Sequence, residues 1–546
     1  MRQQRIVILG AGISGLSAAW YLARYAGAAA ATRALPPLKI TVVEKQPRVG
    51  GWVQTLRNNG DDGDVFELGP RTLRPVGVPG ATTLEMVHKL NLQPHLLTTS
   101  KTSPAALNRY IYAQNSLHHL PTSPLDLLLP WRSQSHSPLL KGILPSILRE
   151  PFVKPRPPPP DPETGYADES VHSFVSRRFG VRVADNLVSA VLHGIYAGDA
   201  RRLSVRSVMP VLWDAESRSG SVIRGLVAPA PPKASVKTPF AIGDGEESAE
   251  EFIADVQKNA SIYSFKGGVQ TLTDALKTDL LSRNSTDVQV EILQGTVDRL
   301  DLPPNPDSPA NVHLTSSPTP LRADHIISSL AAWDLQRLLP PTSPLIPLLD
   351  TIKGVTVGTV NYLLRGAPTT VLPVNGFGYL VPITERTPIL GTVFDSCAMP
   401  VQDVRGDTTR VTVMLGGHKF SEFFGAVDKK LSPETVRAIE HASEVAIHSH
   451  LQIPRLNTQG EPVVLNRYTA VHRDCIPQYT VGHRERLGRM HGVLVGGRMS
   501  VCGASYGGVG VNDCVVGARD LVRGLVERGL QGAGKNVSGL EKFAEE

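Results

Sequence analysis

Near the start of the chain, three glycines are spaced as Gly10-x-Gly12-x-x-Gly15, between an apolar run at 5–9 and a helical pattern from Leu16. In such a motif the first glycine permits a tight turn, the second lets the backbone approach a pyrophosphate, and the third lets the helix pack close to the strand. A pyrophosphate would meet unpaired N–H groups and the positive end of the helix dipole. Glycine-rich turns are common, so the flanking strand and helix carry the prediction. We expect a dinucleotide to be bound by Gly10, Ala11, Gly12, Ile13, Ser14 and Gly15.

An acidic residue and a basic glycine segment follow in the order that a dinucleotide site needs. Glu44 directly follows the next expected strand, at 39–43. At that position a carboxylate can accept hydrogen bonds from the hydroxyls of a ribose. It lies further from the glycines than usual because an alanine-rich insertion intervenes, and a solvated glutamate is the alternative. Arg48 then precedes two glycines, so backbone N–H groups and a cation could face phosphate together.

The far end of the chain repeats this logic with a second glycine-rich turn, Gly503-Ala-Ser-Tyr-Gly-Gly-Val-Gly510. An expected strand precedes the turn, and an apolar helical stripe from Val511 to Leu525 follows it. The start of this helix is a second place where negative charge can be stabilised. A tight terminal turn without a ligand is the alternative.

Composition and charge limit the classes of protein. The 546 residues, 41% hydrophobic and 19% charged, predict two or three domains with full cores. None of the four cysteines forms a CxxC pair, so we expect neither a zinc ribbon nor a disulfide framework. The net charge of +6, without basic runs interleaved with aromatics, favours an anionic ligand or a membrane surface over nucleic acid.

Membrane contact is expected in the middle of the chain. Short apolar pieces between Leu125 and Leu148 are mixed with Trp131 and basic residues, which suits a bilayer interface. An ordinary helical domain packed on its neighbour is the alternative. No window reaches 18 uninterrupted apolar residues, so we expect no spanning helix. The first strand begins within five residues of Met1, so we expect any organelle address to be internal.

The expected fold class is α/β, with α+β multi-domain organisation. As the family resemblance below implies, it combines a Rossmann-like FAD-binding domain, a mixed-sheet substrate domain and a helical membrane-associated domain. Strands expected at 288–293, 323–329, 355–364, 389–394 and 410–415 suggest the mixed sheet. The expected domains are FAD-binding at 1–95, 265–300 and 480–530, substrate-binding at 96–120 and 323–479, and helical at 121–228. Flexible insertions are expected at 229–260 and 302–322, and a disordered tail at 531–546.

Motifs along the whole chain resemble the amine-oxidase-like FAD superfamily and, within it, the protoporphyrinogen oxidase family. The two opening motifs and the segment 66–71 carry the superfamily resemblance. More specific are Cys475-Ile-Pro-Gln-Tyr-Thr-Val-Gly-His483 and Gly503-Ala-Ser-Tyr-Gly-Gly-Val-Gly-Val-Asn-Asp513. Further matches are Asn108-Arg-Tyr, Gly194-Ile-Tyr-Ala-Gly-Asp199, Gly376-Phe-Gly-Tyr-Leu-Val-Pro382 and Arg410-Val-Thr-Val-Met-Leu-Gly-Gly417. The proline-rich insertions look like those of a fungal mitochondrial member.

The resemblance implies a flavoenzyme of haem biosynthesis. The family oxidises protoporphyrinogen IX to protoporphyrin IX in three two-electron steps, which pass through FAD to oxygen and give hydrogen peroxide. One non-covalent FAD per chain is implied, with peripheral attachment to the mitochondrial inner membrane, on the intermembrane-space side. No nucleic acid is expected as a partner, and homodimerisation and contact with a ferrochelatase are left open.

Site residues follow from the resemblance. Gly10 to Gly15 would hold the pyrophosphate, Glu44 the ribose, Val297 the adenine through its backbone, and Val509, Gly510 and Val511 the isoalloxazine. Lys45 is also expected to bind the cofactor. The flavin and its chain would contact Arg48, Gly51, Trp52, Gly69, Pro70, Arg71 and Thr72.

For the substrate, the resemblance implies that Arg109 pairs with a propionate, as a guanidinium can do bidentately. Gly194 would offer its carbonyl to pyrrole N–H groups. The macrocycle would contact Phe377, Leu380, Met414 and Ile476. From the residues alone, Arg109 would be a surface arginine and the apolar four would be core.

No Ser/His/Asp arrangement, paired carboxylate site or metal cluster emerges, so we expect neither a catalytic acid or base nor a metal site. This suits hydride transfer to a flavin, in which the protein mainly orients its ligands. The alternatives are an amine oxidase or carotenoid desaturase on the same fold, and a non-catalytic carrier like the Rab GDP-dissociation inhibitors.

Overall fold

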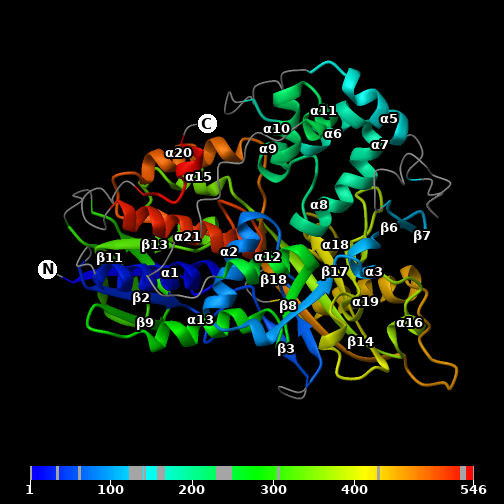
Figure 1. Ribbon diagram of the computed structural model, residues 1–546, viewed down its shortest axis with the longest axis horizontal. Coiled ribbons are helices and arrows are strands. Elements are labelled where there is room, and N and C mark those ends of the chain that lie inside the picture. The colour runs from blue at the N-terminus through cyan, green and yellow to red at the C-terminus, as the bar shows by residue number, and fades with distance from the viewer. Residues whose placement is uncertain are drawn as a thin grey trace.

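The computed structural model describes residues 3–31, 36–58, 63–121, 139, 143–155, 167–228, 249–303, 308–426, 431–528 and 537–544. Two sheets dominate this part of the chain, and a group of helices projects from one side (Figure 1). Most of the apolar cluster expected at the membrane, and the polyproline segment 155–162 beyond its first residue, lie outside the described residues.

The first sheet is parallel, with the order β19-β13-β1-β2-β9. Parallel strands are covered on both faces, and β1 and β2 are accordingly almost continuously apolar and buried. The strands span Gln4–Leu9 (β1), Leu38–Glu44 (β2), Val288–Gln294 (β9), His325–Ser328 (β13) and Met499–Val501 (β19). The strands expected at 5–9, 39–43 and 288–293 are confirmed. The strand expected at 323–329 also exists, but it pairs with β1 rather than in the mixed sheet, so that assignment was wrong.

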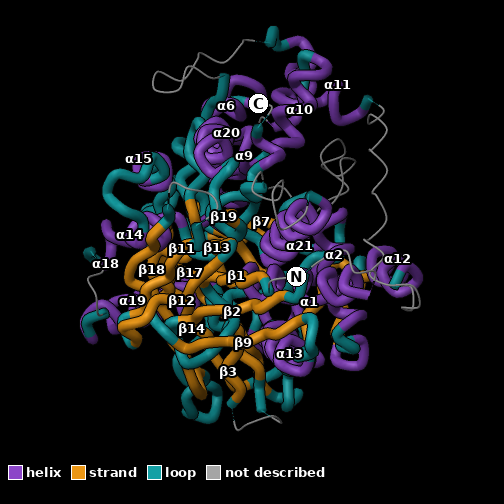
Figure 2. The backbone as a smooth tube through the Cα atoms, turned by 90° about the vertical axis from the view of Figure 1, so that its left-hand side faces the viewer, coloured by secondary structure: helices purple, strands orange, loops and turns teal. Residues whose placement is uncertain are grey.

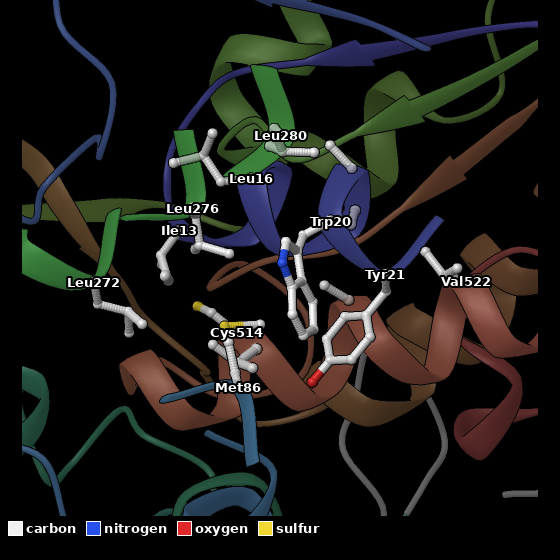
Figure 3. Packing of buried hydrophobic residues seen from close by; sticks show 14 of the residues in the cluster. Ile13, Leu16, Trp20, Tyr21, Met86, Leu272, Leu276, Leu280, Cys514 and Val522 are labelled. Atoms are coloured by element: carbon white, nitrogen blue, oxygen red, sulfur yellow. The ribbon is translucent and has the colours of Figure 1, made fainter. Parts of the chain in front are cut away.

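Helices from opposite ends of the chain cover one face of this sheet. In Figure 3, Leu16, Trp20 and Tyr21 of α1 lie between Leu276 and Leu280 of α13 and Cys514 and Val522 of α21. Trp20 is fully buried, and its Nε1 donates to Asp279 Oδ2 at 2.9 Å. These helices span Ile13–Ala31 (α1), Gly77–Lys89 (α2), Gln270–Ser282 (α13) and Val511–Glu527 (α21). The stripe expected from Val511 to Leu525 is the buried face of α21.

The opposite side of the sheet packs against a small antiparallel sheet, β10-β11-β12, and further helices. The flexible insertion expected at 302–322 was wrong in its described part, because proline-containing β12 pairs with β11 and Val312 is fully buried. The elements span Val297–Asp301 (β10), Ala310–Leu314 (β11), Ser317–Ala323 (β12), Ala332–Leu338 (α14), Ile346–Asp350 (α15) and His483–Leu494 (α20).

The second large sheet is mixed, in the order β18-β14-β17-β16-β15-β6-β7. Its strands are Tyr110–Ala113 (β6), Ser116–His119 (β7), Gly354–Arg365 (β14), Gly378–Leu380 (β15), Ile389–Val393 (β16), Thr408–Gly417 (β17) and Val464–Pro477 (β18). The strands expected at 355–364, 389–394 and 410–415 are confirmed. One face packs its apolar residues against the helices Phe420–Phe424 (α18), Pro433–Val445 (α19) and Ala446–His450 (η7). The other face carries Thr359, Asn361 and Thr412, and it reaches the glycine-rich segments.

The projecting helices form a third group, which stands apart in Figures 1 and 2. It is held together by Glu150, which is fully buried and accepts hydrogen bonds from Ser221 Oγ, Val222 N and Arg178 Nη1. The helices span Ile143–Arg149 (α5), Glu150–Phe152 (η4), Val171–Phe179 (α6), Val181–Val183 (α7), Ala184–Val188 (η5), Ser189–Tyr196 (α8), Val205–Val208 (α9), Pro210–Ser219 (α10) and Val222–Val227 (α11). Within the described ranges, no helix combines the length and apolar character that crossing a bilayer requires.

Two more expectations of flexibility were wrong where the chain is described. Residues 249–260 contain α12, Glu250–Asn259, because Ile253 and Val256 share one face and are buried in the core of the first sheet. Near the C-terminus, Val537 is buried and Val501 N of β19 donates to Ser538 O at 2.8 Å. The described part of the tail is therefore docked on the first sheet.

Stability is expected to fall in acid because of a buried histidine. His325 lies in β13 with its Nε2 2.8 Å from Ser500 Oγ, and burial lowers its pKa to about 4. Between pH 7 and 4, His325 takes up more of a proton in the unfolded chain than in the folded protein, because its pKa is lower in the folded protein. The free energy of unfolding should therefore fall by about 3 kcal/mol over this range from this group. Urea unfolding at several pH values should show a shallower decline for His325→Asn, and equal slopes would contradict the prediction.

Candidate flavin and substrate site

Two glycines of the first loop, Gly10 and Gly15, have no room for larger side chains. A Cβ on Gly15 would lie 1.9 Å from Gly10 O, and Gly10 itself has φ +91°. Gly12 pairs with Gly50 in an isolated parallel bridge. The loop thus brings α1 onto β1 and leaves the first N–H groups of α1 without intrahelical partners, as a pyrophosphate site requires.

Glu44 is buried directly beside this loop. Its Oε2 accepts from Ala11 N at 2.8 Å and its Oε1 from Gln46 N at 2.9 Å. Its carbonyl accepts from Gly295 N at 2.8 Å, which brings the start of β10, where Val297 lies, to the same end of the site. Lys45 is exposed. The ribose and adenine positions predicted from the sequence therefore lie together.

Arg48 braces its own loop. Its Nη2 donates to Gly51 O at 2.6 Å, and its Nη1 donates to Val53 O at 3.1 Å. The cation was expected to face phosphate, but in this structure it orders the turn at Gly50 and Gly51, both of which have positive φ.

The backbones of Trp52 and Gly69 lie against each other, which brings the segments 48–52 and 66–71 together. A Cβ on Gly69 would lie 2.0 Å from Trp52 O. The Trp52 side chain is 43% exposed and lies edge-on to His472, with ring centroids 5.3 Å apart. His472 Nε2 lies 2.6 Å from Leu68 O, so an exposed tryptophan face is held over the segment that precedes Gly69.

The segment 69–72, with Pro70 and Thr72 half-buried, is tied to the mixed sheet through Arg71. Arg71 Nη1 lies 3.4 Å from Asp395 Oδ1, and Thr412 Oγ1 donates to Asp395 Oδ2 at 2.6 Å. Both charged side chains of the pair are largely buried, so the ion pair is little screened. The predicted cofactor segment is thereby positioned by the strand that carries Met414.

The C-terminal turn is held by Tyr479. Its hydroxyl accepts from Gly508 N at 3.0 Å and donates to Ala504 O. Gly510 precedes α21, and its N–H donates to Asp513 Oδ2 at 3.2 Å. Val509 packs against the cluster that contains Tyr479, and Val511 begins α21. The three residues predicted at the isoalloxazine thus lie at a rigid helix start.

Replacing Tyr479 with phenylalanine is expected to weaken FAD binding. The change leaves the part-buried Gly508 N–H without its acceptor, at a cost of about 1–3 kcal/mol, which is about 5- to 150-fold in affinity if the turn binds the flavin. Titration of the apoprotein with FAD, followed by flavin fluorescence, measures this. Tyr362→Phe is the control, because its hydroxyl contacts Ser443 within the core of the mixed sheet. Equal FAD affinity in wild type and Tyr479→Phe would contradict the role of Tyr479.

Arg109 directly precedes β6 and is solvent-accessible. The neighbouring Asn108 O accepts from Phe377 N at 3.2 Å. Because β6 runs parallel to β15, Ile111 is paired with Leu380. Two predicted substrate residues are therefore placed beside Arg109 by backbone pairing.

Gly194 and Leu380 touch. A Cβ on Gly194 of α8 would lie 2.7 Å from Leu380 Cδ2. Met414 and Ile476 belong to one apolar cluster with Ala197, at the end of α8. Phe377 packs elsewhere, in the cluster with Ile262. Gly194, Leu380, Met414 and Ile476 therefore lie close to α8. Phe377 lies apart from them, next to the backbone that precedes Arg109.

Tyr479 and Asp395 were missed from the sequence. Tyr479 lies in the Cys-Ile-Pro-Gln-Tyr motif, which could have drawn attention to it, whereas no local signal marks Asp395. His193 was also missed. Its Nδ1 lies 2.6 Å from Val381 O, and its buried Nε2 has no hydrogen-bond partner within the described ranges. Burial lowers its pKa to about 4, which keeps it neutral. Among the residues that the structure describes, no group of side chains suited to a metal ion is present.

These features fit an extended dinucleotide such as FAD. The glycine cradle, a buried glutamate near the adenosine end, the exposed Trp52 face and the start of α21 come from both ends of the chain. Together they define the class of a flavoprotein with one dinucleotide-binding sheet and a separate mixed sheet.

Comparison with known proteins agrees with this class. Residues 13–520 match the family described as flavin containing amine oxidoreductase. Human protoporphyrinogen oxidase is 37% identical over 523 residues, covering 94% of this chain and 96% of the relative. The Schizosaccharomyces pombe protoporphyrinogen oxidase is 30% identical over 541 residues, covering 95% and 98%. A solved structure from Exiguobacterium sp. 255-15 superposes with a TM-score of 0.70 at 19% identity, covering 97% of this chain and all of that one (100%). The chain belongs to the flavin-containing amine oxidoreductase family and, within it, to the protoporphyrinogen oxidases.

Proposed function

We propose that this protein oxidises protoporphyrinogen IX to protoporphyrin IX, with one non-covalently bound FAD, in the penultimate step of haem biosynthesis. One observation carries the proposal. The ion pair of Arg71 and Asp395 connects the cofactor segment 69–72 to the mixed sheet. The segment predicted to contact the flavin therefore lies next to the sheet that carries the predicted macrocycle residues. The names of the relatives at 30–37% identity support the substrate.

The chemistry assigns simple tasks to the side chains. The three two-electron steps together remove three hydrides from methylene bridges and three protons, two of them from pyrrole nitrogens and one from the remaining bridge. Bound flavin supplies a two-electron acceptor that oxygen can reoxidise, with hydrogen peroxide as the product. Leu380, Met414 and Ile476 exclude water and orient the macrocycle, Arg109 fixes a propionate, and the Gly194 carbonyl accepts from pyrrole N–H groups.

Helix α21 stabilises the negative charge that reduction places on the flavin. Its first turn begins at Val511, directly after Val509 and Gly510, and its dipole adds positive potential there. No residue is assigned as catalytic acid or base. Aromatisation of the product supplies the driving force, and the protein mainly orients substrate and cofactor in a dry pocket.

We also propose peripheral attachment to the mitochondrial inner membrane, on the intermembrane-space side. Exposed apolar side chains on the projecting helices support membrane contact, among them Leu148 of α5, Phe152 of η4, Val211 of α10 and Val227 of α11. Phe152 and Val227 are 80% and 81% exposed, respectively. Side chains of this kind can insert into the headgroup boundary of a bilayer.

The test of the proposed activity is direct. Purified protein is expected to show flavin absorption and, in air, to convert protoporphyrinogen IX into fluorescent porphyrin with three hydrogen peroxide molecules per porphyrin. An amine oxidase would instead oxidise amines, and a carrier without flavin would be colourless. Porphyrin formation at the spontaneous rate would contradict the proposal.

A further inference from the structure

Two arginines beside the predicted substrate site have no anionic partner in the part of the chain that the structure describes. Arg74 directly follows Leu73 and the cofactor segment 69–72, and Arg109 directly precedes β6. Both residues are solvent-accessible. This is unlike Arg178 and Arg410, whose guanidinium groups are buried and paired with carboxylates.

A series of contacts places the two arginines on the same side of the site. Leu73 exchanges backbone hydrogen bonds with Tyr263, each of 2.8 Å. Ile262, which precedes Tyr263 in strand β8 (Ala260–Phe265), packs in one cluster with Phe377. Phe377 N donates to the carbonyl of Asn108, the neighbour of Arg109. Partial burial lowers the pKa of Arg109, and the positive charge of Arg74 lowers it further, so the two charges interact.

The backbone at both positions is fixed, while neither side chain contacts a carboxylate among the described residues. Asn512 Nδ2, in the first turn of α21, donates to Arg74 O at 2.7 Å. Leu120 N donates to Arg109 O at 2.8 Å. Two like charges held near each other repel, and a bound dianion would turn this repulsion into attraction. Fixing the backbone before the ligand arrives reduces the entropy cost of binding.

We propose that Arg74 binds the second carboxylate of a dicarboxylate tetrapyrrole whose first carboxylate is held by Arg109. The inference rests on the proposed function, and it deepens that function by naming a second point of substrate recognition. Protoporphyrinogen IX carries two propionates on neighbouring pyrrole rings, so one edge of the macrocycle presents two anions. Each guanidinium can receive one carboxylate bidentately. The arginine pair therefore selects macrocycles with two adjacent carboxylates and sets which edge of the ring faces Arg74.

The test measures binding of a stable dicarboxylate macrocycle, mesoporphyrin IX, to the FAD-loaded protein by absorption titration. Its dimethyl ester serves as the uncharged probe. Arg74→Ala is expected to weaken binding of the diacid by about 10-fold or more and to leave the ester nearly unaffected, since charge-assisted hydrogen bonds are the strong ones. Arg74→Lys should recover part of the loss. Arg337→Ala removes the same charge from an exposed site on α14 and should change neither probe.

Two results would overturn the inference: equal diacid binding in wild type and Arg74→Ala, or equal weakening of diacid and ester, which would indicate a structural role. The porphyrinogen assay separates this from the proposed function. If wild type forms porphyrin but Arg74→Ala retains the diacid preference, only the inference fails. If wild type forms no porphyrin, the proposed function fails, whatever the titration shows.

Discussion

Replacing Gly15 with alanine is expected to abolish flavin binding. The new Cβ would lie 1.9 Å from Gly10 O and 2.7 Å from Ser329 Oγ, so α1 would have to move away from β1. Overpacking usually costs about 1–3 kcal/mol, and here the obstacle is a backbone oxygen that cannot rotate aside. Because the same displacement opens the pyrophosphate cradle, both flavin content and stability should fall. The ratio of flavin to protein absorption and the urea midpoint measure the two effects.

Gly517 provides the matched control for this prediction. It lies in α21, and a Cβ there would meet nothing within 4 Å. Gly517→Ala should therefore retain full flavin and gain up to about 1 kcal/mol from helix propensity. Normal flavin content in Gly15→Ala would show that α1 does not need its close approach to β1.

Replacing Gly194 with valine is expected to lower kcat/KM for porphyrinogen by about 10- to 100-fold, with flavin retained. A Cβ at this position lies 2.7 Å from Leu380 Cδ2, so the added methyl groups push Leu380 into the proposed pocket. The expected loss corresponds to about 1–3 kcal/mol of overpacking. Steady-state porphyrin fluorescence measures the change, beside the flavin content of the same samples.

A second substitution tests the cause. Leu380→Ala in the Gly194→Val background removes the clashing side chain and should restore part of the activity. Gly492→Val, at a helical glycine of α20 with open space around its Cβ, should leave kcat/KM unchanged. Unaltered kcat/KM in Gly194→Val would remove Gly194 from the substrate site.

The cofactor half of the site was largely predictable because its signals are local. A glycine motif between an apolar strand and a helix specifies the cradle, and an acidic residue at the end of the next strand follows from the same fold. Those residues are close in sequence or repeat a known spacing. Glu44 beside Ala11 illustrates this, since both lie at the ends of adjacent parallel strands.

The rest of the site depends on contacts between distant segments. The pair of Arg71 and Asp395 joins residues 324 positions apart, and neither neighbourhood signals the other. Composition also misled us at 302–322, where the prolines suggested flexibility. An antiparallel hairpin forms there instead. Its prolines lie on β12, an edge strand, where proline is tolerated. Strand β13 was placed in the wrong sheet because a short apolar strand does not reveal its partner.

The most direct test of the proposed function mixes the purified flavoprotein with protoporphyrinogen IX in the absence of oxygen. Limiting porphyrinogen should bleach three equivalents of flavin absorption for each porphyrin formed, while benzylamine should leave the flavin oxidised. Re-admission of air should restore the flavin spectrum. An unbleached flavin in the presence of porphyrinogen, or rapid bleaching by the amine, would contradict the proposed activity.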